Sequence, residues 1–324
     1  MKQFLIKSLV FFSIVVAILS LVLVKYGGYV DYFYEKFTSP RASSLILGDS
    51  RSLQGIQPEV IKQYFNNTEV ERPILNYSFT LKQIAYGRPY TESIKRKLDS
   101  TTKNGLFIIS VHPFTLSNRT GQHEEEEGVF FEADMPPHNM KYVNRSPNYE
   151  YLYKNWDYFH FRGIIRKSSK THKDGWLEET NLPDDKKLLQ QWKQNQVSLY
   201  GGFSEKWKKS PVRMAHLEEL CNYLNKHGEV FMLRMPIDND LLQIENAYWE
   251  NFDKDMDKLS KKLHVGYINF NTSENRFQTY DGIHIDKFAG VPFTENLCDS
   301  ISSMLKARKY VLEDSKKDLD LDYE

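Results

Sequence analysis

Five short apolar segments alternate with amphipathic segments along most of the chain. The apolar segments are continuous rather than alternating, which is typical of strands covered on both faces; they span residues 43–50, 72–79, 105–114, 228–237 and 265–270. Helices are predicted over residues 58–65, 82–99, 212–227, 241–263 and 286–309. Strands that alternate with helices predict an α/β fold, a three-layer α/β/α sandwich around a five-stranded, mostly parallel sheet.

A different pattern opens the chain. Residues 9–24, LVFFSIVVAILSLVLV, carry no charge and are flanked by Lys7 and Lys25. Sixteen residues rise roughly 24 Å as a helix, slightly less than the ~30 Å hydrocarbon core, and flanking lysines can reach the headgroups. Because no small-x-small cleavage site follows, the pattern favours a transmembrane signal-anchor over residues 1–26 rather than a cleaved signal peptide.

The next residues, 27–42, are rich in Tyr and Phe, which predicts an aromatic linker at the membrane interface. Lysine and arginine occur on both sides of the apolar run, so their count does not set its orientation. A short basic start before an apolar run is nevertheless the shape of a secretory signal-anchor. We therefore expect the globular part to be periplasmic or extracellular.

One connection in the predicted domain, residues 43–312, is much longer than a crossover needs. It spans about residues 115–212 and is interpreted either as a lid or substrate wall, or as a helical decoration with its own small core. The chain ends in an acidic tail, residues 313–324, which is predicted to be solvated or disordered.

Composition narrows the classes of function. With 43 basic and 43 acidic residues the chain lacks the positive field that nucleic-acid binding needs. Aromatic residues make up 14% of the chain, which suits carbohydrate or membrane contacts as well as core packing. Cys221 and Cys298 are too few for a disulfide framework or a zinc site, so two buried thiols are expected. No glycine-rich nucleotide motif occurs, and neither a cofactor nor a metal is expected.

Candidate chemistry comes from the two ends of the sheet pattern. Ser50 follows the first apolar segment in LILGDSRS, and Asp281 and His284 follow the last segment in TYDGIHID. Carboxyl ends of parallel strands meet at one edge of a sheet, so these residues are expected to lie together. A serine hydroxyl needs a base, and a histidine oriented by a carboxylate supplies one. The sequence therefore predicts Ser50 as nucleophile, His284 as base and Asp281 as its orienting partner.

These two motifs resemble those of the SGNH (GDSL-type) hydrolase superfamily, which has Gly-Asp-Ser after the first strand and Asp-x-x-His near the end. The resemblance covers roughly residues 43–309 and implies a flavodoxin-like sheet. It also implies an oxyanion hole. Asn76 fits the family pattern Asn-x-Ser-x-x-Gly, in which Leu81 takes the glycine position, and His112 lies near the position of a family asparagine.

Arg51, directly after the serine, resembles the membrane-anchored acyl-transfer branch of this superfamily, which includes proteins of alginate O-acetylation and teichoic-acid D-alanylation. Its guanidinium is interpreted either as a ligand for a substrate carboxylate or phosphate, or as a structural group. Arg234, at the end of the fourth apolar segment, allows the same two interpretations.

The leading hypothesis is thus a membrane-anchored serine esterase or O-acyltransferase acting on acylated envelope polysaccharide. The acyl-transfer resemblance would imply a multipass membrane acyltransferase as partner. Leu81 and His112 depart from the family pattern and keep open an alternative, a catalytically inactive SGNH-like domain that binds glycan or scaffolds an envelope complex. A secreted lipase is a third reading, which no further feature of the sequence supports.

Overall fold

The computed structural model describes residues 1–119, 122–158, 165, 167–272 and 277–321. Its centre is a five-stranded parallel sheet in the order β2-β1-β3-β8-β9. The strands are β1 (Ser44–Leu47), β2 (Ile74–Asn76), β3 (Gly105–Ser110), β8 (Gly228–Arg234) and β9 (Gly266–Asn269). Each lies inside one of the five predicted segments, which confirms the α/β fold class and the parallel sheet.

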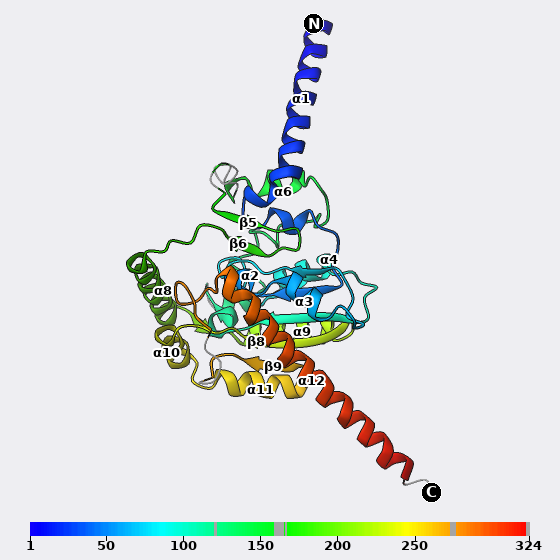
Figure 1. Cartoon of the computed structure of the whole chain (residues 1–324). Helices are drawn as coiled ribbons and strands as arrows, with labels where there is room; N and C mark the ends of the chain where they lie inside the picture. The colour runs from blue at the N-terminus through cyan, green and yellow to red at the C-terminus, as the bar shows by residue number, and fades with distance from the viewer. Residues whose placement is uncertain (120–121, 159–164, 166, 273–276, 322–324) are drawn as a thin grey trace.

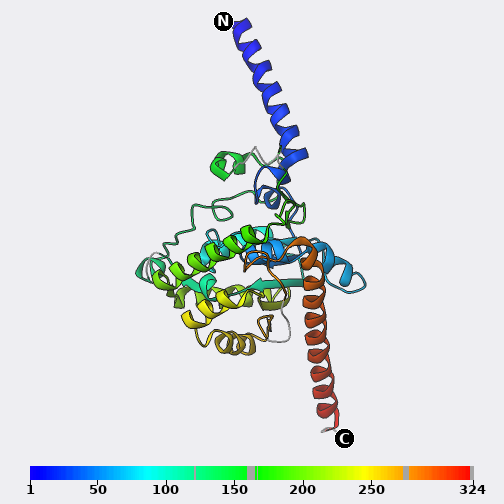
Figure 2. The same ribbon diagram turned by 60° about the vertical axis from the view of Figure 1, so that its left-hand side comes forward.

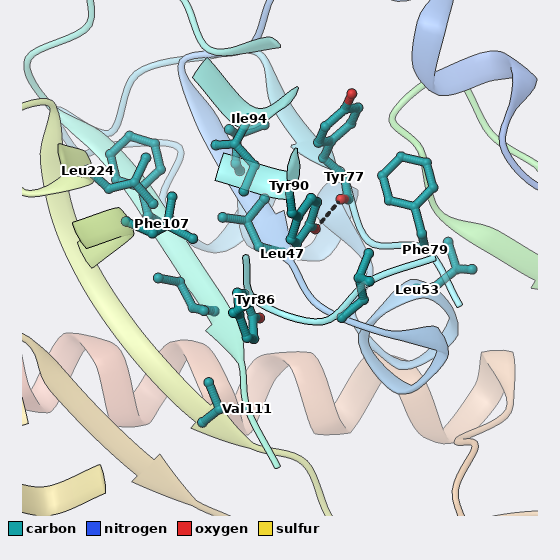
Figure 3. Packing of buried hydrophobic residues seen from close by; sticks show 14 of the residues in the cluster. Leu47, Leu53, Tyr77, Phe79, Tyr86, Tyr90, Ile94, Phe107, Val111 and Leu224 are labelled. Atoms are coloured by element: carbon teal, nitrogen blue, oxygen red, sulfur yellow. Dashed lines mark hydrogen bonds between the residues drawn. The ribbon is translucent and has the colours of Figure 1, made fainter. Parts of the chain in front are cut away.

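Helices cover both faces of the sheet (Figures 1 and 2). Successive strand residues point to opposite faces, so Phe107 and Ile109 of β3 pack into one apolar cluster while Leu106 and Ile108 pack into another. The first cluster, part of which Figure 3 shows, also contains residues of α4, α9 and α11, and the second contains residues of α3 and α12. This arrangement is the predicted three-layer sandwich.

Each of the five predicted helical segments contains a helix, but α2 was not predicted and two segments inside the domain need correction. The helices are α2 (Ser50–Gly55), α3 (Pro58–Tyr64), α4 (Arg88–Lys97), α9 (Pro211–Leu224), α10 (Asn239–Tyr248), α11 (Phe252–Leu263) and α12 (Lys287–Leu321). The single helix predicted over residues 241–263 is two helices. The helix is interrupted after Tyr248 and resumes at Phe252, and this irregular turn buries both Trp249 and Phe252. The helix predicted over residues 82–99 begins only at Arg88, where Pro89 suits a first turn.

The N-terminal helix α1 (Lys2–Tyr26) projects away from the folded domain (Figure 1). It is long and apolar enough to cross a membrane, which a membrane anchor or a signal sequence would both require. Its exposed side chains include Phe4, Phe11, Ile14 and Leu21, whereas Leu23 in its last turn is buried against the domain.

The linker predicted over residues 27–42 is instead part of the folded domain. It forms the 3-10 helices η1 (Gly27–Tyr29) and η2 (Tyr34–Phe37), and the rings of Phe33, Tyr34 and Phe37 are buried in the main apolar cluster. A Tyr- and Phe-rich segment suits a membrane interface and a protein core equally well, and here most of its rings pack into the core. The folded domain therefore begins before residue 43.

The long connection of about residues 115–212 divides into two parts. The first holds η3 (Pro113–Leu116), β4 (Ser117–Asn118), α5 (Gln122–Glu126), α6 (Tyr149–Lys154), η4 (Trp156–Tyr158) and the hairpin β5 (Ser169–Thr171) and β6 (Leu177–Glu179). The hairpin and α6 pack on residues 27–37 below α1, and we call this assembly the collar. The second part is α8 (Lys186–Lys206), which packs on α10, followed by β7 (Lys208–Lys209), which pairs with β4.

The end of the chain also differs from its prediction. Helix α12 continues to Leu321, so most of the tail predicted over residues 313–324 is helical, while residues 322–324 lie outside the described residues. Cys221 and Cys298 are both buried and free, as expected.

Candidate active site

Ser50 is held at the carboxyl edge of the sheet by a tight turn between β1 and α2. Gly48 in this turn has φ of +143°, and a β-carbon there would lie 2.6 Å from Ser110 Cβ and Ser52 Oγ, so only glycine fits. Asp49 caps α2 by accepting a hydrogen bond from the Arg51 N–H at 3.2 Å. Ser50 is thereby the first residue of a helix at the point where the order of the strands reverses, which is where open α/β sheets place their ligands.

The structure brings Ser50, His284 and Asp281 together as the sequence predicted. Ser50 Oγ lies 2.8 Å from His284 Nε2, and His284 Nδ1 lies 2.7 Å from Asp281 Oδ2. The Ser50–His284 contact joins residues 234 positions apart in the sequence. The Ser50 side chain is half-buried and those of His284 and Asp281 are 11% and 7% exposed, so the chain of three groups lies at a surface that small molecules can reach.

The Asp281 carboxylate fixes the proton positions on the imidazole. Its Oδ1 accepts hydrogen bonds from the N–H groups of Ile283 at 3.1 Å and His284 at 2.9 Å. Burial would raise the pKa of Asp281, but His284 and these backbone donors hold it below its usual value. An ionised carboxylate only accepts, so Nδ1 carries the proton and donates it to Asp281. The Nε2 lone pair of the neutral ring then faces the Ser50 hydroxyl, as a general base requires.

Two backbone amides are candidates for oxyanion donors. Ser50 stands at the N-terminus of α2, where an N–H has no intrahelical partner, and within the described residues the Leu81 N–H has no hydrogen-bond partner. The Leu81 side chain packs in one apolar cluster with Ile283 of the His284 loop. The turn after Leu81 is held by Arg119, whose guanidinium donates to the carbonyls of Leu81, Lys82 and Ile84.

Asn76 supports the nucleophile rather than touching it. Its side-chain amide donates to the carbonyls of Ser52 at 2.8 Å and Ile56 at 3.1 Å, while its Oδ1 accepts from the Ser78 N–H at 3.1 Å. These bonds satisfy carbonyl groups at the end of the short helix α2. Asn76 therefore ties the serine-bearing helix to β2.

His112 does not have the contacts of an oxyanion donor, which corrects its predicted role. It is 1% exposed, its Nε2 lies 2.9 Å from Asp49 Oδ2, and its Nδ1 lies 3.4 Å from Glu245 Oε1. Both ring nitrogens thus face carboxylates under the nucleophile. An asparagine-like donor to the substrate is not supplied by this side chain.

Arg51 and Arg234 belong to the same buried cluster, so the structural interpretation of both holds and the substrate-binding one is corrected. Arg51 Nη2 donates to Glu245 Oε1 at 2.7 Å, and Arg234 Nη2 donates to Glu245 Oε2 at 3.1 Å. Both side chains are 1% exposed, and Arg51 stacks over the Tyr200 ring at 5.3 Å. We call Asp49, His112, Glu245, Arg51 and Arg234 the buried ion cluster.

Glu245 is the hub of this cluster, and no motif in the sequence marked it. Burial would raise its pKa, but Arg51, His112 and Arg234 together hold it well below its usual value. It lies in α10, 194 residues after Arg51. Nothing in the local sequence distinguishes Glu245 from the other polar residues of this amphipathic helix, and only the fold brings it beneath the turn that carries Ser50.

Residues of the long connection form a wall beside His284. From α8, Gln196 donates to Asp281 Oδ2 at 3.4 Å and Trp192 packs against Tyr280, which itself stacks on the His284 ring with centroids 5.8 Å apart. From the collar hairpin, Trp176 Nε1 donates to the Gln54 carbonyl of α2 at 2.7 Å.

The hairpin also brings an acidic group to the site. Burial raises the pKa of Glu179, and the nearby His284 acts in the opposite direction. Sequence analysis missed these wall residues, although a lid or substrate wall was one of its two interpretations of the segment that carries most of them. The connection therefore contributes a wall of the site, and its collar part packs into the main apolar cluster rather than around a small core of its own.

A serine hydroxyl, an imidazole and a carboxylate linked in this order have the arrangement of a Ser-His-Asp triad, which can activate a serine for acyl transfer. Neither the protein-family models nor the curated proteins with which the sequence was compared give a match. The assignment of chemistry therefore depends on the geometry of this site.

Proposed function

We propose that this protein is a membrane-anchored serine esterase or O-acyltransferase of the SGNH type. The observation that carries the proposal is the hydrogen-bonded chain Ser50–His284–Asp281 at the carboxyl edge of a flavodoxin-like sheet. The strand order and the tight turn from Gly48 to Ser50 add support, because they hold an accessible hydroxyl beside His284, whose tautomer Asp281 fixes.

In the first half of the reaction Ser50 Oγ attacks the carbonyl carbon of an ester or thioester. Its proton passes to His284 Nε2 as the C–O bond forms, and the N–H groups of Ser50 and Leu81 stabilise the negative charge on the carbonyl oxygen. The intermediate collapses, the bond to the leaving alcohol or thiol breaks, and that group takes the proton from His284. The product is an acyl ester of Ser50.

In the second half an acceptor hydroxyl gives its proton to His284 Nε2 and attacks the acyl carbon. The bond to Ser50 Oγ breaks, and the serine recovers its proton from His284. Water as acceptor gives an esterase, whereas a sugar hydroxyl gives an O-acyltransferase. Asp281 stabilises the imidazolium that forms in each half.

The proposed substrate class is acylated envelope polysaccharide, with the globular domain outside the cytoplasm. The apolar helix α1 and the aromatic wall residues Trp176, Trp192 and Tyr280 support this choice, because aromatic faces suit sugar rings. A multipass membrane acyltransferase that supplies the acyl group is part of the proposal by analogy with the acyl-transfer branch.

The test uses the full chain in detergent micelles. Release of p-nitrophenol from p-nitrophenyl acetate measures acylation, and the mass of an added acetyl-accepting oligosaccharide measures transfer. We expect Ser50→Ala and His284→Gln to abolish both, while Ser52→Ala, a matched buried serine in the same helix, keeps most of the activity. Unchanged activity in Ser50→Ala would refute the proposal.

A non-catalytic SGNH-like domain that binds glycan is the second candidate, and one observation favours it. His112 faces Asp49 and Glu245 instead of supplying an oxyanion donor, so the site has fewer donors than its family pattern implies. This candidate predicts oligosaccharide binding that survives Ser50→Ala, together with no acyl release in the unmodified protein.

A further inference from the structure

The collar carries exposed aromatic rings beside the apolar helix α1. In α6 and η4, Tyr149 is 44% exposed, Tyr153 is 87% exposed and Trp156 is 57% exposed. Tyr142, 37% exposed, lies just before them in the chain. We call these four residues the aromatic ledge. Exposed large rings gathered in one short segment are unusual on a soluble surface and mark an interaction site.

The ledge is fixed to the domain and cannot swing freely. Tyr151 of α6 is fully buried, with its ring 5.6 Å from Tyr34 and 5.0 Å from Phe37. Asn148 caps α6 by accepting from the Tyr151 N–H and donates to the Phe37 carbonyl at 3.2 Å. The orientation of the exposed face of α6 is therefore set by the core.

That exposed face is turned toward the apolar part of α1. The Tyr149 hydroxyl is hydrogen-bonded to Ser20 Oγ, and Tyr153 lies one helical turn further along the same face of α6. Ser20 lies within the uncharged run of residues 9–24, about 6 Å inside its end at Val24 at 1.5 Å per residue. A bilayer that encloses this run reaches the level of Tyr149.

The charges around the ledge fit an anionic lipid surface. Lys141 and Arg145 are exposed beside it, with the Arg145 guanidinium 3.7 Å above the Tyr142 ring, and Lys154 of α6 pairs with Glu150. Tyr and Trp rings with flanking basic residues are the composition of membrane-interface segments.

We propose that the aromatic ledge inserts into the interface of the same bilayer that α1 enters, as a second contact between the domain and anionic lipid. Two contacts, α1 and the ledge, fix the tilt of the domain over the membrane. The hairpin that completes the collar also bonds to α2, so this contact sets how the catalytic edge faces the bilayer. The inference depends on insertion of α1 and is independent of the proposed acyl transfer.

The test measures the depth of the ledge in vesicles made of phosphatidylcholine and phosphatidylglycerol in equal parts. The full chain carries a nitroxide at Tyr153→Cys or, as a matched control, at Lys262→Cys on α11 at the opposite end of the domain (Figure 1). Cys221 and Cys298 are buried, and the chain without an added cysteine measures their background labelling. Collisions with oxygen, which concentrates in lipid, are compared with collisions with a water-soluble nickel complex.

We expect the Tyr153 label to collide several-fold less with nickel and more with oxygen than the Lys262 label. Equal nickel collisions at the two positions would overturn the proposal, because the ledge would then lie in water. Exclusion of both reagents from Tyr153 would also overturn it, since a protein partner or a second copy of the chain would then cover the ledge. Tyr153 is too exposed for its replacement to disturb folding.

Discussion

Two histidine–carboxylate pairs lie on either side of the peptide that joins Asp49 to Ser50, and their surroundings differ. His284 is 2.7 Å from Asp281 and turns its other nitrogen to a half-buried hydroxyl. His112 is 2.9 Å from Asp49 and turns its other nitrogen to a second carboxylate, Glu245, in a cluster that is at most 1% exposed. A histidine and a carboxylate thus form an arrangement that can move a proton where a hydroxyl and solvent are within reach. Where neither is within reach, the same pair is a structural contact.

The comparison shows that the buried ion cluster supports the turn that carries Ser50. Asp49 has two roles, because its Oδ1 caps helix α2 while its Oδ2 pairs with His112. Burial would raise the pKa of Asp49, but His112, Arg51 and His284 hold it below its usual value. An ionised cap stabilises the start of α2, where Ser50 stands.

The largest effect on the rate is expected from a substitution that changes the hydrogen bond between Asp281 and His284. Asp281→Asn places an amide beside Nδ1 and favours the wrong tautomer, so the rate of p-nitrophenyl acetate hydrolysis should fall by about 10⁴-fold. The melting temperature should change little, because the amide still accepts from the backbone N–H groups of Ile283 and His284. A variant with near-normal activity would show that Asp281 does not orient the base.

The next effect concerns the buried ion cluster. Glu245→Gln removes the carboxylate that Arg51 and Arg234 share, and breaking a buried ion pair costs about 3–5 kcal/mol of unfolding free energy. Arg234 keeps its pair with Asp253 at 2.7 Å and Arg51 keeps, among the described carboxylates, only Asp49 at 3.8 Å, so the loss is expected in the lower part of that range. Chemical denaturation of the full chain in micelles measures this loss. Glu219→Gln on α9, whose side chain is 52% exposed, is the matched control and should cost less than about 1 kcal/mol. Equal losses in the two variants would contradict the role of Glu245 as a hub.

Stability should depend on pH through the same carboxylates. The pKa values of Glu245 and Asp49 are lowered on folding, so the unfolded chain binds more protons in acid. Their contribution is fully present above the ordinary glutamate pKa of 4.5 and is lost as pH falls from there through the folded values. Denaturation curves at several pH values should therefore show a steeper acid loss in the unmodified protein than in Glu245→Gln. Parallel losses would exclude Glu245 as a source.

The smallest effect on chemistry is expected from His112. His112→Asn removes the ring that bridges Asp49 and Glu245 and should lower the unfolding free energy by about 1–3 kcal/mol. Loss of an oxyanion donor lowers a rate by about 10²–10³-fold, and the rate of hydrolysis in His112→Asn should fall by less than this. A loss in that larger range without a change in stability would restore His112 to the oxyanion hole.

The sheet and the triad could be predicted because local patterns encode them. Continuous apolar segments predict buried parallel strands, and the carboxyl ends of parallel strands meet at one edge of the sheet. Ser50 and His284 follow the first and last of these strands and therefore meet at that edge. The buried ion cluster could not be predicted, because an arginine directly after Ser50 is equally suited to bind a substrate and to pair with a residue such as Glu245. Nothing in the local sequence tells which of the two lies nearby. The collar was missed for a similar reason, since Phe33 and Phe37 satisfy the pattern of a membrane belt and of a core.

The most direct test of the account is the intact mass of the full chain after exposure to a fluorophosphonate, which reacts with a serine activated by a histidine. We predict one adduct, mapped to Ser50, which persists in Ser52→Ala and is absent from Ser50→Ala and His284→Ala. No adduct on the folded protein, or an adduct that survives Ser50→Ala, would contradict the claim that this triad activates Ser50.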